Sequence, residues 1–191
     1  MILAIDPSGN FNEGKGITGW VALNEKTGEI FRFGSLDAGT CLSMEEHWQR
    51  HLDLIDQYIK YNNDLTIIIE DYMLYANKAM TQVNSRFETP KLIGVIQHYC
   101  YQRGVTLHFQ TAVTVQRRWK NFLLERKGFL TIKEYVKNGK TYEMTYIGTF
   151  KVNDHIVDAL KHAVHFYFFH VQGGKNDTQT ESISEEYQRS E

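Results

Sequence analysis

The stretch LTIIIE at residues 65–70 decides the fold class of this chain. The run is apolar and β-branched, and it lacks the alternation that marks a strand with one face in water. Such a run is typical of a central strand that helices cover on both faces. Residues 2–5 form a second apolar run, which ends at Asp6. The two runs predict an α/β protein with a buried sheet.

Three more strands and several helices follow from local patterns. Residues 17–23 and 30–36 are strand-like with turn-forming residues between them, and residues 105–109 are a further strand. Ser43 and Glu46 form a capping box, which indicates a helix start. We expect Pro90 to interrupt any helix before residue 91. Helices are predicted over residues 44–61, 91–102 and 152–171. The order predicts a five-stranded mixed sheet, with three antiparallel strands and then parallel strands joined by helical crossovers.

The second half of the chain has its own features. Residues 114–126 are predicted to form one basic helix. Asn138-Gly139 is a strong two-residue turn signal, which predicts a β-hairpin near residues 130–149. The tail over residues 172–191 is polar and is predicted to be disordered. We therefore expect one domain over residues 1–171, with the hairpin as an insertion.

Composition and charge exclude several classes of protein. Of the 191 residues, 42% are hydrophobic, which is enough for a core and excludes a disordered chain. The longest apolar stretch, residues 164–171, is much too short to span a bilayer, and no signal peptide is evident. Two cysteines, expected as reduced thiols, favour a cytoplasmic protein. The net charge of −2 hides a block at residues 100–151 with ten basic and three acidic residues. That block is a candidate phosphate-binding surface.

Acidic residues stand at the ends of predicted elements. Asp6 and Glu70 each end a strand, and the functional crevice of an open α/β sheet lies outside the carboxyl ends of its strands. If these strands are parallel neighbours, the two carboxylates converge. Asp154, His155 and Asp158 lie in the first turns of the last helix and share one face. Clustered carboxylates are the donors that paired Mg²⁺ ions require for phosphodiester hydrolysis.

These residues resemble the RuvC family of Holliday junction resolvases. In that family the first strand ends in a catalytic Asp-Pro, a later strand ends in Glu, and the last helix carries Asp or His, two residues, then Asp-Ala-Leu. The matching segments are AIDP at residues 4–7, TGWV at 18–21, IIE at 68–70, KL and a glycine at 91–94, and HIVDAL at 155–160. The resemblance covers roughly residues 1–36, 65–126 and 152–166.

The resemblance implies an RNase H-like fold and a homodimer that resolves four-way junctions and other branched DNA. It implies two Mg²⁺ ions per site, for which Mn²⁺ substitutes, and no small-molecule cofactor. Asp6, Glu70, His155 and Asp158 would be the catalytic and metal-binding residues, with Asp154 as the alternative to His155. The long loop at residues 7–16 and the hairpin resemble phage-encoded members, which places the protein in a host cytoplasm.

DNA and dimer contacts are also expected. The predicted DNA-binding residues are Arg117, Arg118, Lys120 and Lys127 of the basic segment, with Tyr72 or Tyr75 as the aromatic group at the junction centre. The dimer contact is expected on the helix over residues 91–102, through Ile93, Ile96 and Tyr99.

Other functions stay open or are disfavoured. An inert RNase H-like DNA-binding module and an RNA-processing nuclease of the same fold remain alternatives. The sequence GNFNEGKG at residues 9–16 lacks the hydroxyl residue of a P-loop and leads into a strand. A zinc site on His155, His162 and His165 lacks further ligands, so we expect His162 to pack or hydrogen-bond near the site.

Overall fold

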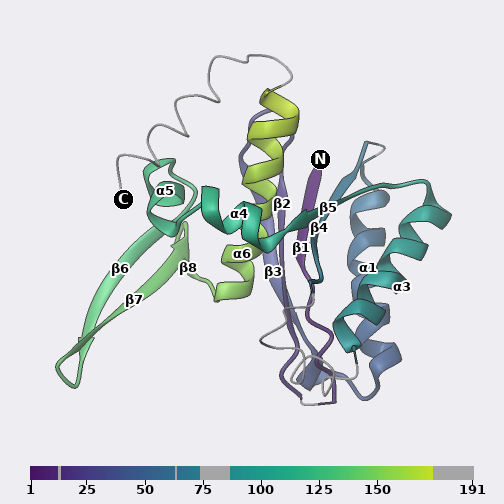
Figure 1. Cartoon of the computed structure of the whole chain (residues 1–191), viewed down its shortest axis with the longest axis horizontal. Coiled ribbons are helices and arrows are strands. Elements are labelled where there is room, and N and C mark those ends of the chain that lie inside the picture. Colours follow the sequence, from purple (N-terminus) through teal and green to yellow (C-terminus); the bar gives the residue numbers. More distant parts are fainter. Residues whose placement is uncertain (13, 63, 74–86, 174–191) are drawn as a thin grey trace.

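A five-stranded mixed sheet runs through the middle of the chain, with helices on both of its faces (Figure 1). The computed structural model describes residues 1–12, 14–62, 64–73 and 87–173. The strand order is β3-β2-β1-β4-β5. The strands are β1 (Ile2–Asp6), β2 (Ile17–Leu23), β3 (Ile30–Asp37), β4 (Thr66–Asp71) and β5 (Thr106–Thr111).

The strand directions are those predicted. β1, β2 and β3 pair antiparallel, whereas β1 pairs parallel with β4, and β4 pairs parallel with β5. The carboxyl ends of β1, β4 and β5 therefore lie at one edge of the sheet. The expected mixed α/β architecture is confirmed.

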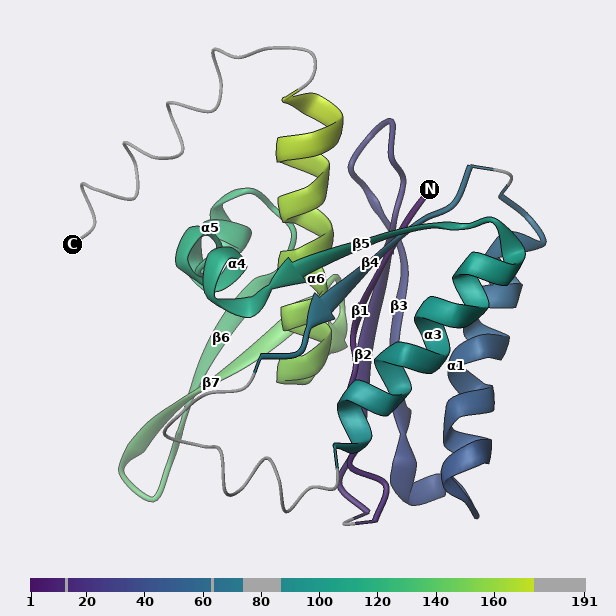
Figure 2. The ribbon, with the colours of Figure 1, turned by 45° about the vertical axis from the view of Figure 1, so that its right-hand side comes forward.

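Alternate side chains of the central strands enter two separate cores. Leu3 and Ile5 of β1 pack with α1 (Met44–Ile59) and α3 (Glu88–Arg103). Ile2 and Ala4 face the other side, where α6 (Asp154–Phe166) lies. Figure 2 shows α1 and α3 on one side of the sheet and α6 on the other. Because direction alternates along a strand, Asp6 belongs to the same side as Ala4 and α6.

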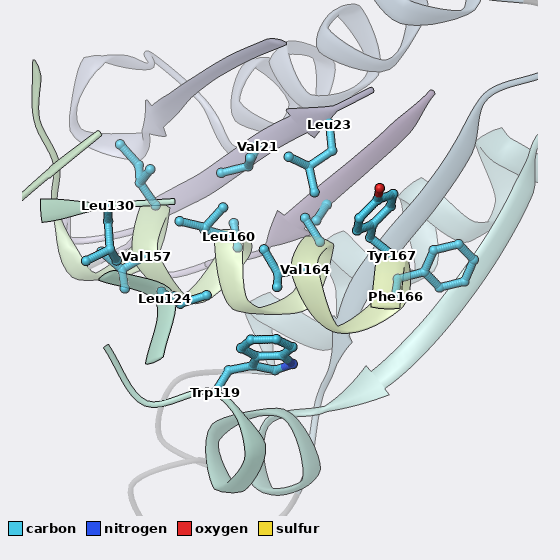
Figure 3. Packing of buried hydrophobic residues seen from close by; sticks show 14 of the residues in the cluster. Val21, Leu23, Trp119, Leu124, Leu130, Val157, Leu160, Val164, Phe166 and Tyr167 are labelled. Carbon is cyan, nitrogen blue, oxygen red and sulfur yellow. The ribbon is translucent and has the colours of Figure 1, made fainter. Parts of the chain in front are cut away.

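The last helix is more deeply buried than an amphipathic pattern implies. Leu160 and Val164 face β1 and β2, while Trp119 and Leu124 cover α6 from outside (Figure 3). These two residues come from the segment of α4 (Ala112–Arg118) and α5 (Asn121–Arg126). α6 continues beyond Phe166 as a π-helical segment, η3 (Tyr167–Gln172), and α1 is preceded by the short 3-10 helix η1 (Ala38–Thr40).

Two helix predictions need correction. The basic segment is two short helices, because Trp119 leaves the helical conformation and its indole turns into the core. Burial of this large ring outweighs helix continuity. Pro90 does not interrupt a helix: α3 begins at Glu88, so Pro90 lies in the first turn, where backbone N–H groups have no partner within the helix.

The predicted hairpin is present as β6 (Thr131–Lys137) and β7 (Lys140–Ile147), followed by β8 (Phe150–Lys151). Asn138 and Gly139 both have positive φ, 53° and 72°, as the two-residue turn requires. The three strands form a separate sheet. The hairpin extends away from the body of the molecule (Figure 1).

Some expectations concern parts that the structure places differently or does not describe. Ile93 and Ile96 lie in the core beneath α3, so they are not available to a partner. Most of the tail predicted to be disordered, residues 174–191, lies outside the described residues. Both cysteines are free. Among the described helices, none has the length and apolar character needed to cross a membrane.

Candidate active site

A row of residues crosses four strands at the carboxyl edge of the sheet. Gly19 of β2 pairs with Asp6 of β1, and Glu70 of β4 pairs with Gln110 of β5. The register of β1 and β4, in which Ile5 pairs with Ile69, places Asp6 beside Glu70. Neighbouring strands are about 4.8 Å apart, so the side chains of Asp6 and Glu70 lie close to one another.

Gly19 lets the last helix approach this row. A Cβ atom on Gly19 would lie 2.1 Å from the backbone carbonyl carbon and oxygen of His155 and 2.5 Å from the nitrogen of Ile156. No side chain fits at that distance. Glycine inside a strand often marks such a close backbone approach, and here it sets the first turn of α6 against Asp6.

One face of α6 presents polar side chains to the row. His155, Asp158 and His162 follow at spacings of three and four residues, so they lie on one side of the helix. The Nδ1 atom of His155 is 2.9 Å from Oδ2 of Asp6. The Nε2 atom of His162 is 2.9 Å from Oε2 of Glu70, as expected for a histidine that hydrogen-bonds near the site.

His162 also connects this row of residues to β5, the edge strand of the sheet. Its Nδ1 atom is 2.9 Å from Oε1 of Gln110. The side chain is only 1% exposed, so the ring is fixed by both contacts. His162 therefore positions Glu70, and Gln110 positions His162 in turn. The sequence gives no local signal for Gln110, because its role depends on the pairing of β4 with β5.

The carboxylates of the site act on one another. Burial raises the pKa of Asp6, the hydrogen bond with His155 opposes this effect, and the negative charges of Glu70 and Asp158 raise the pKa further. The hydrogen bond with Asp6 in turn raises the pKa of His155 against the opposing effect of its partial burial. A partly buried carboxylate that is repelled by two other carboxylates is a site where a cation would be stabilised.

The donor chemistry suits a hard divalent cation, although the donors are engaged with protein partners. Oxygen donors of Asp6, Glu70 and Asp158 are the type that Mg²⁺ prefers. In the described part of the chain, no three His, Cys, Asp or Glu side chains converge closely enough to hold a metal ion. His155 forms a hydrogen bond with Asp6, and His162 forms one with Glu70. Nζ of Lys161 lies 2.8 Å from Oδ1 of Asp158. Metal binding at these residues therefore requires exchange of these contacts.

The structure distinguishes His155 from Asp154. His155 contacts Asp6 directly, whereas Asp154 is exposed in the first turn of α6 and acts on His155 through its charge. The helix start itself is set by Asn153, whose Oδ1 accepts a hydrogen bond from the backbone nitrogen of Ile156. This cap fixes the helical phase that directs His155 toward the sheet.

A buried hydrogen-bond network holds the loop that follows Asp6. The backbone nitrogen of Ser8 donates to Oγ1 of Thr18 at 2.9 Å, and Nε2 of His47 is 3.0 Å from the Ser8 carbonyl oxygen. His51 completes the network, with Nε2 2.9 Å from the same Thr18 hydroxyl. His47 and His51 are fully buried. Sequence reasoning missed both, although two histidines four residues apart on the apolar face of a helix are a signal of buried polar contacts.

The same loop is also attached to the start of α3. The backbone nitrogen of Gly9 donates to Oγ1 of Thr89 at 3.0 Å. Asn12 donates from its side-chain and backbone nitrogens to the carboxylate of Glu88, which is 3% exposed. The loop is therefore anchored to β2, α1 and α3, and the position of Asp6 depends on all three.

The predicted DNA-binding residues lie in different surroundings. Arg117, Arg118, Lys120 and Lys127 are all exposed on or beside α4 and α5. Arg118 lies over the ring of Phe169 at 4.5 Å and Lys127 over that of Phe168 at 5.6 Å. Trp119 is buried and is not a stacking surface. Tyr72 packs against the core beneath α1 and α3, and Tyr75 lies outside the described residues.

Comparison with known proteins concerns the fold. No protein-family model matches the chain, and no curated protein matches it. Among solved structures, it is similar to Thermus thermophilus RuvC in complex with a Holliday junction substrate, with a TM-score of 0.59 and 12% identity over 88% of this chain and 92% of that one. A second Thermus thermophilus RuvC structure gives a TM-score of 0.55 and 15% identity over 90% of this chain and 96% of that one. The chain thus has the fold of the RuvC Holliday junction resolvases, as its motifs predicted.

Proposed function

We propose that the chain is a metal-dependent nuclease that resolves Holliday junctions and other branched DNA. The observation that carries the proposal is the row of Asp6 and Glu70 at the ends of adjacent parallel strands, faced by His155 and Asp158 of α6. The likeness to a structure described as RuvC with a Holliday junction substrate supports the substrate class.

Asp6, Glu70 and Asp158, with His155, are the residues proposed to hold Mg²⁺ or Mn²⁺. When bound, two such ions supply an activated water and stabilise the departing 3′ oxygen of a phosphodiester. The protein's own contribution is positioning. His155 fixes the carboxylate of Asp6, His162 fixes that of Glu70, and Lys161 neutralises part of the charge of Asp158 before the metal arrives.

We also propose a homodimer, which a two-fold symmetric junction would match. With Ile93 and Ile96 in the core, the exposed groove between α1 and α3 is the remaining candidate surface on these helices. Its lining includes Trp48, Leu52 and Val95. The exposed basic residues of α4 and α5 are proposed to contact phosphates, and the likeness of the long loop and hairpin to phage-encoded members stays a prediction.

The test is cleavage of a synthetic four-way junction with Mg²⁺, compared with a linear duplex of the same sequence and an RNA–DNA hybrid. We expect cleavage of the junction alone. Asp6→Asn and Glu70→Gln, measured separately, should abolish cleavage while junction binding persists, because binding rests on basic contacts to phosphates. Glu45→Gln, on an exposed carboxylate in the first turn of α1, is the matched control and should cleave normally.

The outcomes separate the alternatives. Binding without cleavage by the wild-type chain would indicate the inert DNA-binding module. Preferred cleavage of the RNA–DNA hybrid would indicate an RNA-processing nuclease. Normal cleavage by either carboxylate variant would show that the active site lies elsewhere.

A further inference from the structure

The β6–β7 hairpin, residues 131–147, has two chemically different faces; we call this hairpin the wing. Residues that pair across the two strands share a face. Tyr135 pairs with Tyr142, Lys137 with Lys140, and Glu134 with Glu143. The first face, here the basic face, carries Thr131, Lys133, Tyr135, Lys137, Lys140, Tyr142, Met144 and Tyr146, and the other carries Ile132, Glu134, Val136, Thr141, Glu143 and Thr145.

All three lysines of the wing are thus on the basic face, and both of its glutamates are on the other. Every residue from 133 to 143 is exposed. The ribbon of the wing extends away from the body of the molecule (Figure 2), so these exposed residues do not pack in the core. A lysine-rich face without acidic residues is complementary to a polyanion.

Tyrosine rings pack against neighbouring side chains on the basic face. The rings of Tyr135 and Tyr142 stack with their centroids 5.4 Å apart and their planes at 25°. The ammonium group of Lys133 lies 4.7 Å from the ring centre of Tyr146. Cross-strand aromatic pairs stabilise a hairpin that has few other partners. The tyrosine hydroxyl groups and the lysine ammonium groups can donate hydrogen bonds to phosphate oxygens.

The base of the wing is fixed to α5 and to the core around α6. Ile147 is buried in the core around α6, and the backbone nitrogen of Ile132 donates to Oε1 of Glu125 in α5 at 2.7 Å. β7 pairs with β8, which ends at Lys151, three residues before α6 begins. At a rise of about 3.4 Å per residue, the strands of the wing extend about 20 Å from this base, or several base pairs of duplex.

We propose that the basic face of the wing binds the sugar–phosphate backbone of a duplex arm of the DNA substrate. The proposal rests on the proposed function for its choice of DNA as the polyanion. The wing follows α5 in the chain and contacts Glu125 of that helix. The proposed contacts are to phosphates, so they are independent of base sequence. The wing thereby contributes affinity at a distance from the cleaved bond.

The test measures binding without cleavage. The affinity of a fluorescent four-way junction, of a linear DNA duplex and of an RNA duplex is measured in EDTA across salt concentrations of about 50 to 200 mM. The variant is Lys137→Gln with Lys140→Gln, at the exposed tip of the wing. Loss of two phosphate contacts should weaken junction binding about tenfold or more and reduce the slope of log K against log salt by about 2.

Two control variants each change two residues, and the first is also matched to the test variant in charge. Lys26→Gln with Lys60→Gln removes two exposed lysines outside the wing and should change affinity less than about twofold. Glu134→Gln with Glu143→Gln changes the opposite face and should not weaken binding. Both lysine variants should unfold at the wild-type temperature, since the altered side chains are exposed.

Unchanged affinity and salt slope in the wing variant would overturn the proposal, and so would an equal loss in the two lysine variants. These results leave the proposed function intact if the wild-type chain cleaves junctions. Conversely, a wild-type chain that binds the junction through the wing but never cuts it would refute the nuclease while supporting the wing. A wild-type chain that binds RNA duplex through the wing in preference to DNA would also overturn the proposal.

Discussion

Gly19→Ala should separate the last helix from the sheet at the candidate site. The added Cβ atom would lie 2.1 Å from the carbonyl carbon and oxygen of His155, whereas ordinary contact begins at 3.4 Å. The obstacle is backbone, so the start of α6 must move by about 1.3 Å or β2 must deform. That movement acts directly on the 2.9 Å contact between His155 and Asp6.

Two magnitudes follow from this displacement. A shift of about 1 Å at a reacting group can lower a rate about 100-fold, so we expect the cleavage rate of the four-way junction to fall by that factor or more. Overpacking of a core costs about 1–3 kcal/mol, which corresponds to a decrease of about 2 to 12 °C in unfolding temperature for a domain of this size. Single-turnover cleavage and thermal unfolding measure the two effects.

Gly94→Ala in α3 is the matched stability control. No atom lies within 4 Å of the Cβ position at Gly94, and alanine is favoured over glycine in a helix by about 1 kcal/mol. The control should therefore be as stable as the wild type or more so. A Gly19→Ala variant that retains wild-type cleavage and stability would refute the claim that this close approach builds the site.

Three further predictions concern other parts of the molecule. His155→Ala should lower cleavage about 100-fold or more, whereas Asp154→Asn should have a small effect; the opposite pattern in a Mg²⁺-dependent assay would transfer the role to Asp154. Burial lowers the pKa of His51 and of His165 from 6.5 to about 4, so the unfolded chain binds more protons between these values. The contribution of these two histidines to the free energy of unfolding should be constant above pH 6.5 and decrease by up to about 3 kcal/mol per histidine as the pH falls to about 4. Urea unfolding at a series of pH values between 6.5 and 4 would contradict this if stability rose on acidification. Val95→Arg in the groove between α1 and α3 should convert a dimer into a monomer in sedimentation experiments, and an unchanged mass would exclude this surface.

Much of the fold was predictable because its signals are local. The unbroken apolar run before Glu70 indicated a strand buried on both faces, and β4 is an internal strand that lies between β1 and β5. The turn at Asn138-Gly139 was predictable because few other residue pairs adopt positive φ twice in succession. Pro90 and Trp119 were misjudged for opposite reasons. A proline was given too much weight in the first turn of a helix, and a buried indole too little weight as a helix breaker.

In the candidate site, too, local sequence patterns predict some features and not others. The sequence by itself determined that Asp6 and Glu70 lie at the carboxyl ends of buried strands and that Asp158 lies in the first turns of a helix, because local residue patterns indicate both the side-chain chemistry and the approximate bounds of each element. Only the tertiary structure decided that His162 joins Glu70 to Gln110, and that His155 reaches Asp6 over a glycine. Those contacts depend on strand register and on a helix crossing angle, which arise when segments separated by up to 149 positions pack together.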